Sequence, residues 1–139
     1  LDTELEGGVV DSATAVNLAI IQAHPDIIGA FGTTGNSPIT WSDAATKAGK
    51  ADGEIAIVGM DATEGNLNAL DSGKVVALVA QPLYQEAYLT MQYFDKLLRG
   101  EEVPTWTSLT APIVTKDGTG ENGIEYHRSI AAEVSTFFK

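Results

Sequence analysis

Short apolar runs alternate, along most of this chain, with segments in which apolar residues recur at the spacing of a helix. That alternation limits the possible fold classes more than any other feature. Residues 27–34 read IIGAFGTT, residues 55–60 read IAIVGM, and residues 74–80 read KVVALVA. Strands that alternate with helices indicate βαβ units, and continuous apolar strands indicate a parallel sheet covered on both faces. The sequence therefore predicts an α/β fold, a parallel sheet flanked by helices.

Caps and helix breakers mark the predicted boundaries. Pro25 follows the first segment of helical spacing and ends it. Ser37 and Pro38 supply an N-cap and a proline at the first helical position, and Gly49 ends the helix that they start. The pattern predicts helices at residues 9–23, 37–48, 63–72, 84–99 and 121–138, and a last strand at residues 109–115.

Composition excludes several classes of function. The chain has 139 residues, 44% of them hydrophobic, which is enough for one domain with a core. Only 8 Lys and Arg accompany a net charge of -11, so nucleic acid is an unsuitable partner, and solubility alone explains the acidity. The absence of cysteine fits an extracytoplasmic bacterial protein. Because the chain begins with Leu1 instead of Met, we expect a processed chain or a piece of a longer one.

Polar side chains follow three of the predicted strands. Thr33, Thr34 and Asn36 come after the first strand, Asp61 after the second and Gln81 after the third. The carboxyl ends of parallel strands meet at one edge of a sheet, where ligands bind in α/β folds. The sequence therefore predicts a polar rim, and Asp61 is its only charge.

Two local explanations compete with a ligand site. Asp61 is equally suited to capping the helix that follows, with Glu64 completing a capping box. The threonines are ordinary turn formers. Trp41, Tyr84 and Trp106 offer rings on which a ligand could stack, but packing is the more common role of such residues.

Six segments, taken in order, carry a family resemblance, and they are AHPDIIGAF, TKAGK, EIAIVGMDATEGNLNAL, SGKVVALVAQP, LLRGEEVP and TAPIVT. The chain resembles the C-terminal half of ribose-binding-protein-like periplasmic binding proteins from about Leu1 to Thr115. Such proteins capture solutes, typically sugars, for ABC importers, and their two α/β lobes close on the ligand. Lactose-repressor-type regulators use a similar core, so an effector-binding regulator is the alternative.

The resemblance also implies which residues bind ligand. The family's Gly-Phe-Asp strand end matches Gly59-Met60-Asp61, whose carboxylate would accept hydrogen bonds from sugar hydroxyls as the main anchor. The family's Ala-Gln at the lobe crossing matches Ala80-Gln81, whose amide offers a donor and an acceptor. Its common Asn-Asp falls on Thr34-Gly35, which is a departure, and Met60 replaces an aromatic residue. The predicted ligand-binding residues are Asp61, Gln81, Thr34, Thr33, Asn36 and Trp41.

The resemblance further implies that the first lobe is missing. Residues 1–81 would form the second lobe, incomplete at its start. Residues 82–108 would form a crossing helix and hinge, and residues 109–139 a returning strand and helical tail. In the family the crossing helix packs with the first lobe, so its apolar face would lack cover here. We expect a complementing fragment, a homo-oligomer such as a swapped dimer, or a rearranged helix. That face comprises Ala87, Met91, Phe94 and Leu97.

Catalysis is not expected. No nucleophile, glycine-rich phosphate loop or metal-ligand cluster accompanies Asp61 in the sequence, which disfavours an α/β enzyme that uses this residue as an acid or base. We expect neither a cofactor nor a metal. The implied partners are a sugar-like small molecule and an ABC permease, and the implied location is periplasmic, or extracellular with a lipid anchor.

Overall fold

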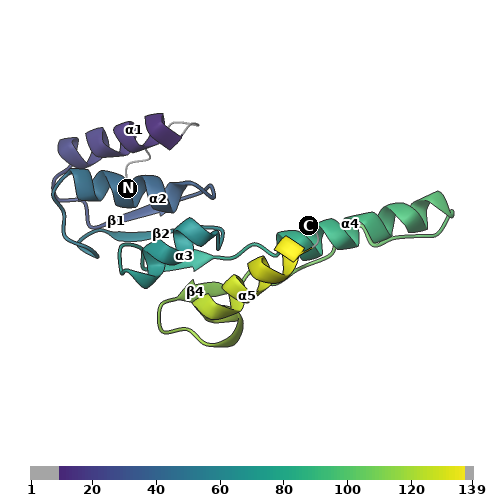
Figure 1. Ribbon diagram of the computed structural model, residues 1–139. Helices are drawn as coiled ribbons and strands as arrows, with labels where there is room; N and C mark the ends of the chain where they lie inside the picture. The colour runs from purple at the N-terminus through teal and green to yellow at the C-terminus, as the bar shows by residue number, and fades with distance from the viewer. Residues whose placement is uncertain (1–9, 137–139) are drawn as a thin grey trace. The chain divides into compact units, whose positions relative to one another are not determined.

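The computed structural model describes residues 10–136 of the chain. The ends of the first and last predicted helices, at Val9 and Phe138, lie outside the described residues. The described residues fall into two compact units, the first within Leu1–Ala80 and Pro112–Lys139 and the second within Gln81–Ala111. Figure 1 gives the order of the helices and strands in both.

The first unit is built on a four-stranded sheet in the order β1-β2-β3-β4. The first three strands run parallel, with Phe31 opposite Val58 and Val58 opposite Ala77. The fourth strand pairs antiparallel with the third, which places Val114 opposite Leu78. The sheet is therefore parallel except at the β4 edge. Its strands are β1 (Gly29–Gly32), β2 (Ala56–Met60), β3 (Ala77–Val79) and β4 (Ile113–Thr115).

Helices cover one face of this sheet. Ile57 and Leu78 point to that face and are 2% and 0% exposed. Gly59 lies so close to α2 that a Cβ atom on it would stand 2.5 Å from Cγ of Pro38. Since α1 packs on α2 and α3 contacts both α2 and α5, all four helices contribute to one layer. They are α1 (Val10–Ala23), α2 (Ser37–Lys47), α3 (Glu64–Asp71) and α5 (Ile124–Ser135).

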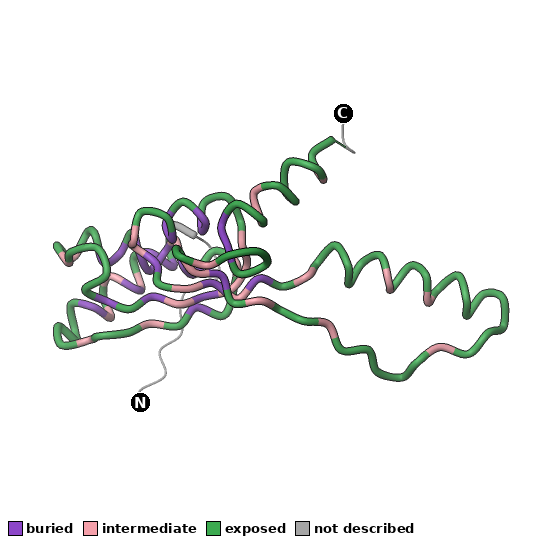
Figure 2. Tube along the Cα trace, turned by 90° about the horizontal axis from the view of Figure 1, so that it is seen from below, coloured by how far each residue is buried: buried purple, intermediate pink, exposed green. Residues whose placement is uncertain are grey.

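The opposite face of the sheet is open over the described residues. Along β2, the buried residues Ile57 and Gly59 alternate with the half-buried Val58 and Met60, and the colours along the strands in Figure 2 follow this burial pattern. Phe31 and Ile113 on the open face are 58% and 56% exposed. The sequence predicts cover on both faces, and that prediction is wrong within the first unit because α1, α2, α3 and α5 all lie on the other side of the sheet.

Most predicted elements form close to their expected bounds. The last strand is antiparallel and shorter than predicted, because it begins at Ile113, although the Pro112 carbonyl still accepts a hydrogen bond of 2.9 Å from the Ala80 amide. The start of α2 is also shifted by one position. Asn36 occupies the N-cap without a side-chain cap bond, and Ser37 is already helical. A short 3-10 helix (Gly120–Asn122) precedes α5.

The second unit consists of α4 (Leu83–Leu98) and an extended return segment. The hydroxyl groups of Tyr93 and Thr107 lie 2.8 Å apart and join the helix to the return. No residue of α4 is buried. Its apolar side chains, including Met91 at 67% and Phe94 at 57% exposure, form an uncovered stripe.

None of the described helices is both long and apolar enough to cross a membrane.

Candidate ligand-binding site

Asp61 follows β2 directly and has an unusual backbone. Its φ is 68°, in the left-handed region, and it is the one residue other than glycine with positive φ among those described. The amide of Asp61 donates a hydrogen bond of 2.8 Å to the carbonyl oxygen of Val79 at the end of β3. Residues other than glycine rarely adopt this conformation, and such residues cluster at functional sites.

Asp61 does not cap the following helix. Thr63 is the N-cap of α3, and its hydroxyl oxygen accepts a hydrogen bond of 3.4 Å from the amide of Asn66. The interpretation of Asp61 and Glu64 as a capping box is therefore wrong. Thr63 performs this role because its extended backbone directs the hydroxyl toward the first turn. The carboxylate of Asp61 is left available for another role.

The two oxygens of the Asp61 carboxylate have different surroundings. Oδ1 is buried and has no hydrogen-bond partner among the described residues. A Cβ atom on Gly35 would stand 2.5 Å from Oδ2, so the carboxylate lies directly over that glycine. The loop after β1 and the loop after β2 therefore meet, as the rim prediction requires. A side chain at position 35 would collide with the Asp61 carboxylate.

Asn66 is a residue of this region that the sequence analysis misses. It is 0% exposed, and its amide nitrogen lies 2.9 Å, 3.2 Å and 2.8 Å from the carbonyl oxygens of Gly35, Met60 and Asp61. Its Oδ1 is buried without a partner in the described part of the chain. The sequence carries no signal for this role, because an asparagine near the start of a short helix is usually exposed and its burial here is a tertiary effect.

The other polar residues of the rim lie on the loop between β1 and α2. The Thr34 and Ser37 hydroxyls are 2.8 Å apart, so Thr34 is tied to the first turn of α2. Thr33 and Asn36 are exposed. These side chains and Asp61 belong to adjacent loops at the carboxyl ends of β1 and β2.

Two predicted residues stand apart from this group. Trp41 belongs to the hydrophobic core and is 8% exposed, which leaves little of its ring for a ligand. Its role in stacking stays a prediction, and its burial favours the packing alternative. Gln81 is exposed and is the first residue of the second unit, so its place beside Asp61 stays a prediction.

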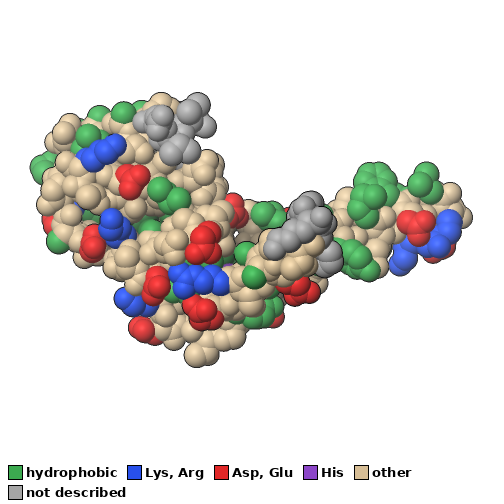
Figure 3. Space-filling view, in the orientation of Figure 1, with side chains coloured by type: hydrophobic (Ala, Val, Ile, Leu, Met, Phe, Trp, Pro, Cys, Tyr) green, Lys and Arg blue, Asp and Glu red, His purple; other side chains and the backbone are tan. Residues whose placement is uncertain are grey.

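The described ion pairs of the first unit do not involve Asp61. A hydrogen bond from Lys50 to Glu54, with Nζ to Oε1 at 2.7 Å, lowers the pKa of Glu54, and the Ala51 amide adds to this effect. Arg128 lies within 4 Å of three carboxylates, and its hydrogen bond to Glu125 raises its pKa. In Figure 3, blue side chains lie beside red ones over this unit. None of the described ion pairs includes Asp61.

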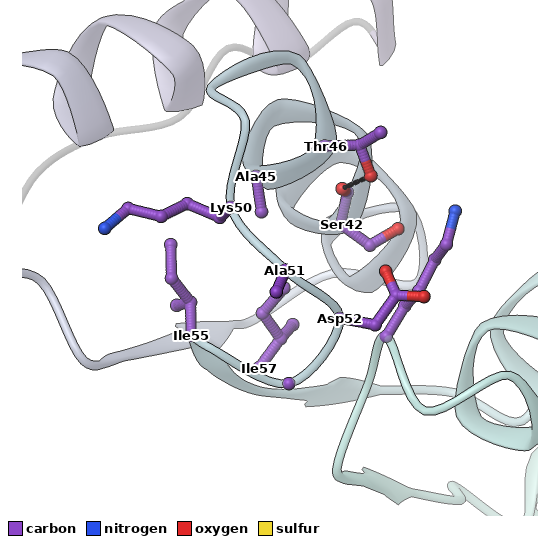
Figure 4. Close-up of a pocket in the computed structure, with 10 residues that line it drawn as sticks. Ser42, Ala45, Thr46, Lys50, Ala51, Asp52, Ile55 and Ile57 are labelled. Atoms are coloured by element: carbon purple, nitrogen blue, oxygen red, sulfur yellow. Dashed lines mark hydrogen bonds between the residues drawn. The ribbon is translucent and has the colours of Figure 1, made fainter.

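The cavities do not coincide with the rim. One hollow of about 10 Å³ lies between α2 and the segment before β2, at the opposite end of that strand from Asp61, and is lined by Ser42, Thr46 and Lys50 among others (Figure 4). It is about large enough for one water. A wider groove of about 480 Å³ lies beside the turn at 118–123. The described residues contain no cluster of His, Asp and Glu suited to a metal.

The fold and the strand-end site define a class of protein. The family model for the periplasmic binding protein domain matches residues 4–102, and the chain belongs to that family. Family members of this kind are solute-binding proteins. The chain is 31% identical over 97 residues to the ribose import binding protein of Salmonella typhimurium, an alignment that covers 70% of this chain and 32% of the relative. The corresponding Escherichia coli protein is 30% identical with the same coverage.

Solved structures agree on the fold. An ABC transporter solute-binding protein from Agrobacterium vitis with bound D-fucose superposes with a TM-score of 0.78 at 24% identity, covering 85% of this chain and 40% of that one. The arabinose-binding component from Shewanella gives a TM-score of 0.75 at 19% identity, covering 91% and 43%. The chain thus spans about a third of the curated relatives and less than half of the matched structures.

Proposed function

We propose that this chain is part of an extracytoplasmic solute-binding protein that captures a sugar or a similar polyhydroxylated molecule for an ABC importer. The observation that carries the proposal is the Asp61 carboxylate, which stands at the carboxyl end of β2 with Oδ1 buried and unpartnered among the described residues. A buried oxygen without a donor is costly, and binding sites retain costs of this kind; Asp61 as a residue is only half-buried, so a ligand hydroxyl can approach it. The left-handed backbone of Asp61 is the kind of strain that binding sites maintain.

The chemistry of the rim suits a neutral polyol. A carboxylate accepts hydrogen bonds from two neighbouring hydroxyl groups, and such charge-assisted bonds are the strong ones. Thr34 and Thr33 on the neighbouring loop are suited to contacts with further hydroxyls, and Gln81 would add a donor and an acceptor. None of the described ion pairs brings a cation to Asp61, which disfavours an anionic ligand.

The named relatives support sugars as the ligand class. The curated relatives are ribose import binding proteins, and matched structures hold D-fucose, D-allose or arabinose. These names point to import and away from gene regulation, so we favour an importer role with an ABC permease as partner. They also support a location outside the cytoplasm and a binding role without catalysis.

We further propose that the chain works together with more polypeptide. Residues 1–81 would belong to one lobe, residues 82–108 would cross to the other lobe, and residues 109–139 would return. The open sheet face around Phe31 and the uncovered stripe on α4 support this, because each large apolar side chain gains about 1.5–3 kcal/mol on burial. In Figure 3, hydrophobic side chains gather along α4. Closure of two lobes would then complete the site and exclude water.

A thermal-shift screen tests this function. The protein from the complete reading frame is melted with D-ribose, L-arabinose, D-fucose or D-allose, because a ligand of the folded state raises the melting temperature. Ribose 5-phosphate serves as the anionic control. At least one neutral sugar should raise the melting temperature, and that rise should be lost in Asp61→Asn. No shift with any sugar, or a shift with the phosphate alone, contradicts the proposal.

A further inference from the structure

Three backbone carbonyl groups converge on one buried side chain at the candidate site. The amide nitrogen of Asn66 lies within 3.2 Å of the carbonyl oxygens of Gly35, Met60 and Asp61. An amide oxygen in that place would face three acceptors, so the chemistry fixes the nitrogen there. Two N–H donors serve three carbonyls, which requires one shared hydrogen bond. Asn66 thus joins the loop after β1 to the end of β2.

Asn66 is itself held by the core. Its backbone N–H donates to the hydroxyl of Thr63, the N-cap of α3, and the next side chain, Leu67, is 0% exposed. The helix is anchored further by Leu70, which is also 0% exposed. The position of the Asn66 side chain is therefore determined by packing. Its hydrogen bond to the Asp61 carbonyl in turn fixes the backbone of Asp61.

The backbone of Asp61 needs such support. A left-handed conformation is unfavourable for an L-residue, so φ of 68° persists only where neighbouring contacts hold it. Two contacts do so, because the Asp61 amide donates to Val79 and the Asp61 carbonyl accepts from Asn66 at 2.8 Å. Gly35 has a complementary role. Because glycine has no side chain, Gly35 leaves the space that the Asp61 carboxylate occupies.

We infer that Asn66 is a positioning residue that fixes the left-handed backbone of Asp61 and so aims its carboxylate at the ligand. Asn66 is 0% exposed and acts through Asp61 instead of touching the ligand. As a statement about ligand affinity, the inference rests on the proposed function. As a statement about the Asp61 backbone, it does not.

Asn17 provides a matched control. Like Asn66, it is an asparagine with 0% exposure and a buried Oδ1 that has no partner among the described residues. Its amide donates to the Thr40 hydroxyl at 3.2 Å, between α1 and α2 and outside the three carbonyl contacts. Removing either amide should lower stability, but only Asn66→Ala should alter Asp61.

The first arm of the test measures the backbone by NMR on the 139-residue chain. Backbone couplings report φ of Asp61, and amide hydrogen exchange reports its bond to Val79. In Asn66→Ala, the couplings should leave left-handed values and exchange of the Asp61 amide should accelerate by about tenfold or more. In Asn17→Ala, both should match the wild type. Retained left-handed couplings in Asn66→Ala, or an equal change in Asn17→Ala, overturns the inference.

A second variant covers the case in which Asn66→Ala does not fold. Asn66→Asp keeps the shape of the side chain but points a carboxylate at three carbonyl oxygens, and only its protonated form can donate. Left-handed couplings at Asp61 should therefore be lost at neutral pH and recover as the pH falls. Couplings that stay left-handed at every pH contradict the inference, as does a failure to recover on acidification.

The second arm measures affinity with D-ribose, L-arabinose, D-fucose and D-allose on the protein from the complete reading frame. Asn66→Ala should weaken binding by about tenfold or more, as loss of a supporting contact commonly does, and Asn17→Ala by much less. Equal weakening in both variants overturns the positioning role. If the wild type binds none of the four sugars, the proposed function fails, and the NMR arm decides the inference alone.

Discussion

Replacing Asp61 by glycine should make the chain more stable while it abolishes ligand binding. At φ of 68°, an L-residue is disfavoured by roughly 1–2 kcal/mol, and glycine removes that cost. Glycine also gives the unfolded chain more conformational freedom, which offsets about 0.5–1 kcal/mol. The substitution removes a buried, unpartnered carboxylate oxygen as well. We expect a net gain of about 0.5–1 kcal/mol.

Urea denaturation of the 139-residue chain measures this change. The midpoint should rise for Asp61→Gly at an unchanged slope, since the substitution alters stability without altering the surface exposed on unfolding. In the protein from the complete reading frame, the same substitution should eliminate sugar binding. A stability gain with a loss of binding is the signature of a strained residue that is kept for its function.

Asp61→Asn separates backbone strain from charge. Asparagine and aspartate bear a similar cost in the left-handed region, so this variant should unfold within about 0.5 kcal/mol of the wild type. A loss of more than about 1 kcal/mol in Asp61→Gly would refute the reasoning, because the carboxylate would then stabilise the fold instead of serving a ligand.

Three further predictions concern the frame of the site. Thr63→Ala removes the hydrogen bond that caps α3, so the free energy of unfolding measured in urea should fall by about 1 kcal/mol. Gly59→Ala places a methyl group 2.5 Å from a proline ring atom and should cost about 1–3 kcal/mol, whereas Gly29→Ala, whose nearest atom is at 3.6 Å, should change stability little; equal costs contradict the packing argument. The pKa of Glu54 is lowered by Lys50, so the stability that this pair adds is present at neutral pH and is lost as the pH falls through the depressed pKa. Melting temperatures of wild type and Glu54→Gln should therefore differ at pH 7 and converge in acid.

Periodicity and caps predict most of the fold because they are local signals. The apolar run at 55–60 becomes β2 and the run at 74–80 contains β3. The open face of the sheet is not predictable in this way, because a continuous apolar strand specifies that both faces are apolar and not which helices cover them. The antiparallel direction of β4 is equally invisible, since strand direction depends on the path of the connection.

The candidate site likewise has features that the sequence predicts and features that only tertiary contacts determine. The position of Asp61 at a strand end is readable from the sequence, because charge after an apolar run marks where a strand leaves the core. Its left-handed backbone and its contact with Gly35 depend on two loops meeting, 26 positions apart in the chain. Asn66 was missed because an asparagine at a helix start is usually a surface residue. Its burial is a tertiary effect.

Isothermal titration calorimetry tests the central claim most directly. Wild type and Asp61→Asn, both from the complete reading frame, are titrated with the sugar that gives the largest thermal shift. A hydrogen bond to a charged group contributes about 1.5–3 kcal/mol, so Asp61→Asn should bind roughly 10- to 100-fold more weakly than the wild type. Equal affinity of the two proteins would show that Asp61 does not anchor the ligand.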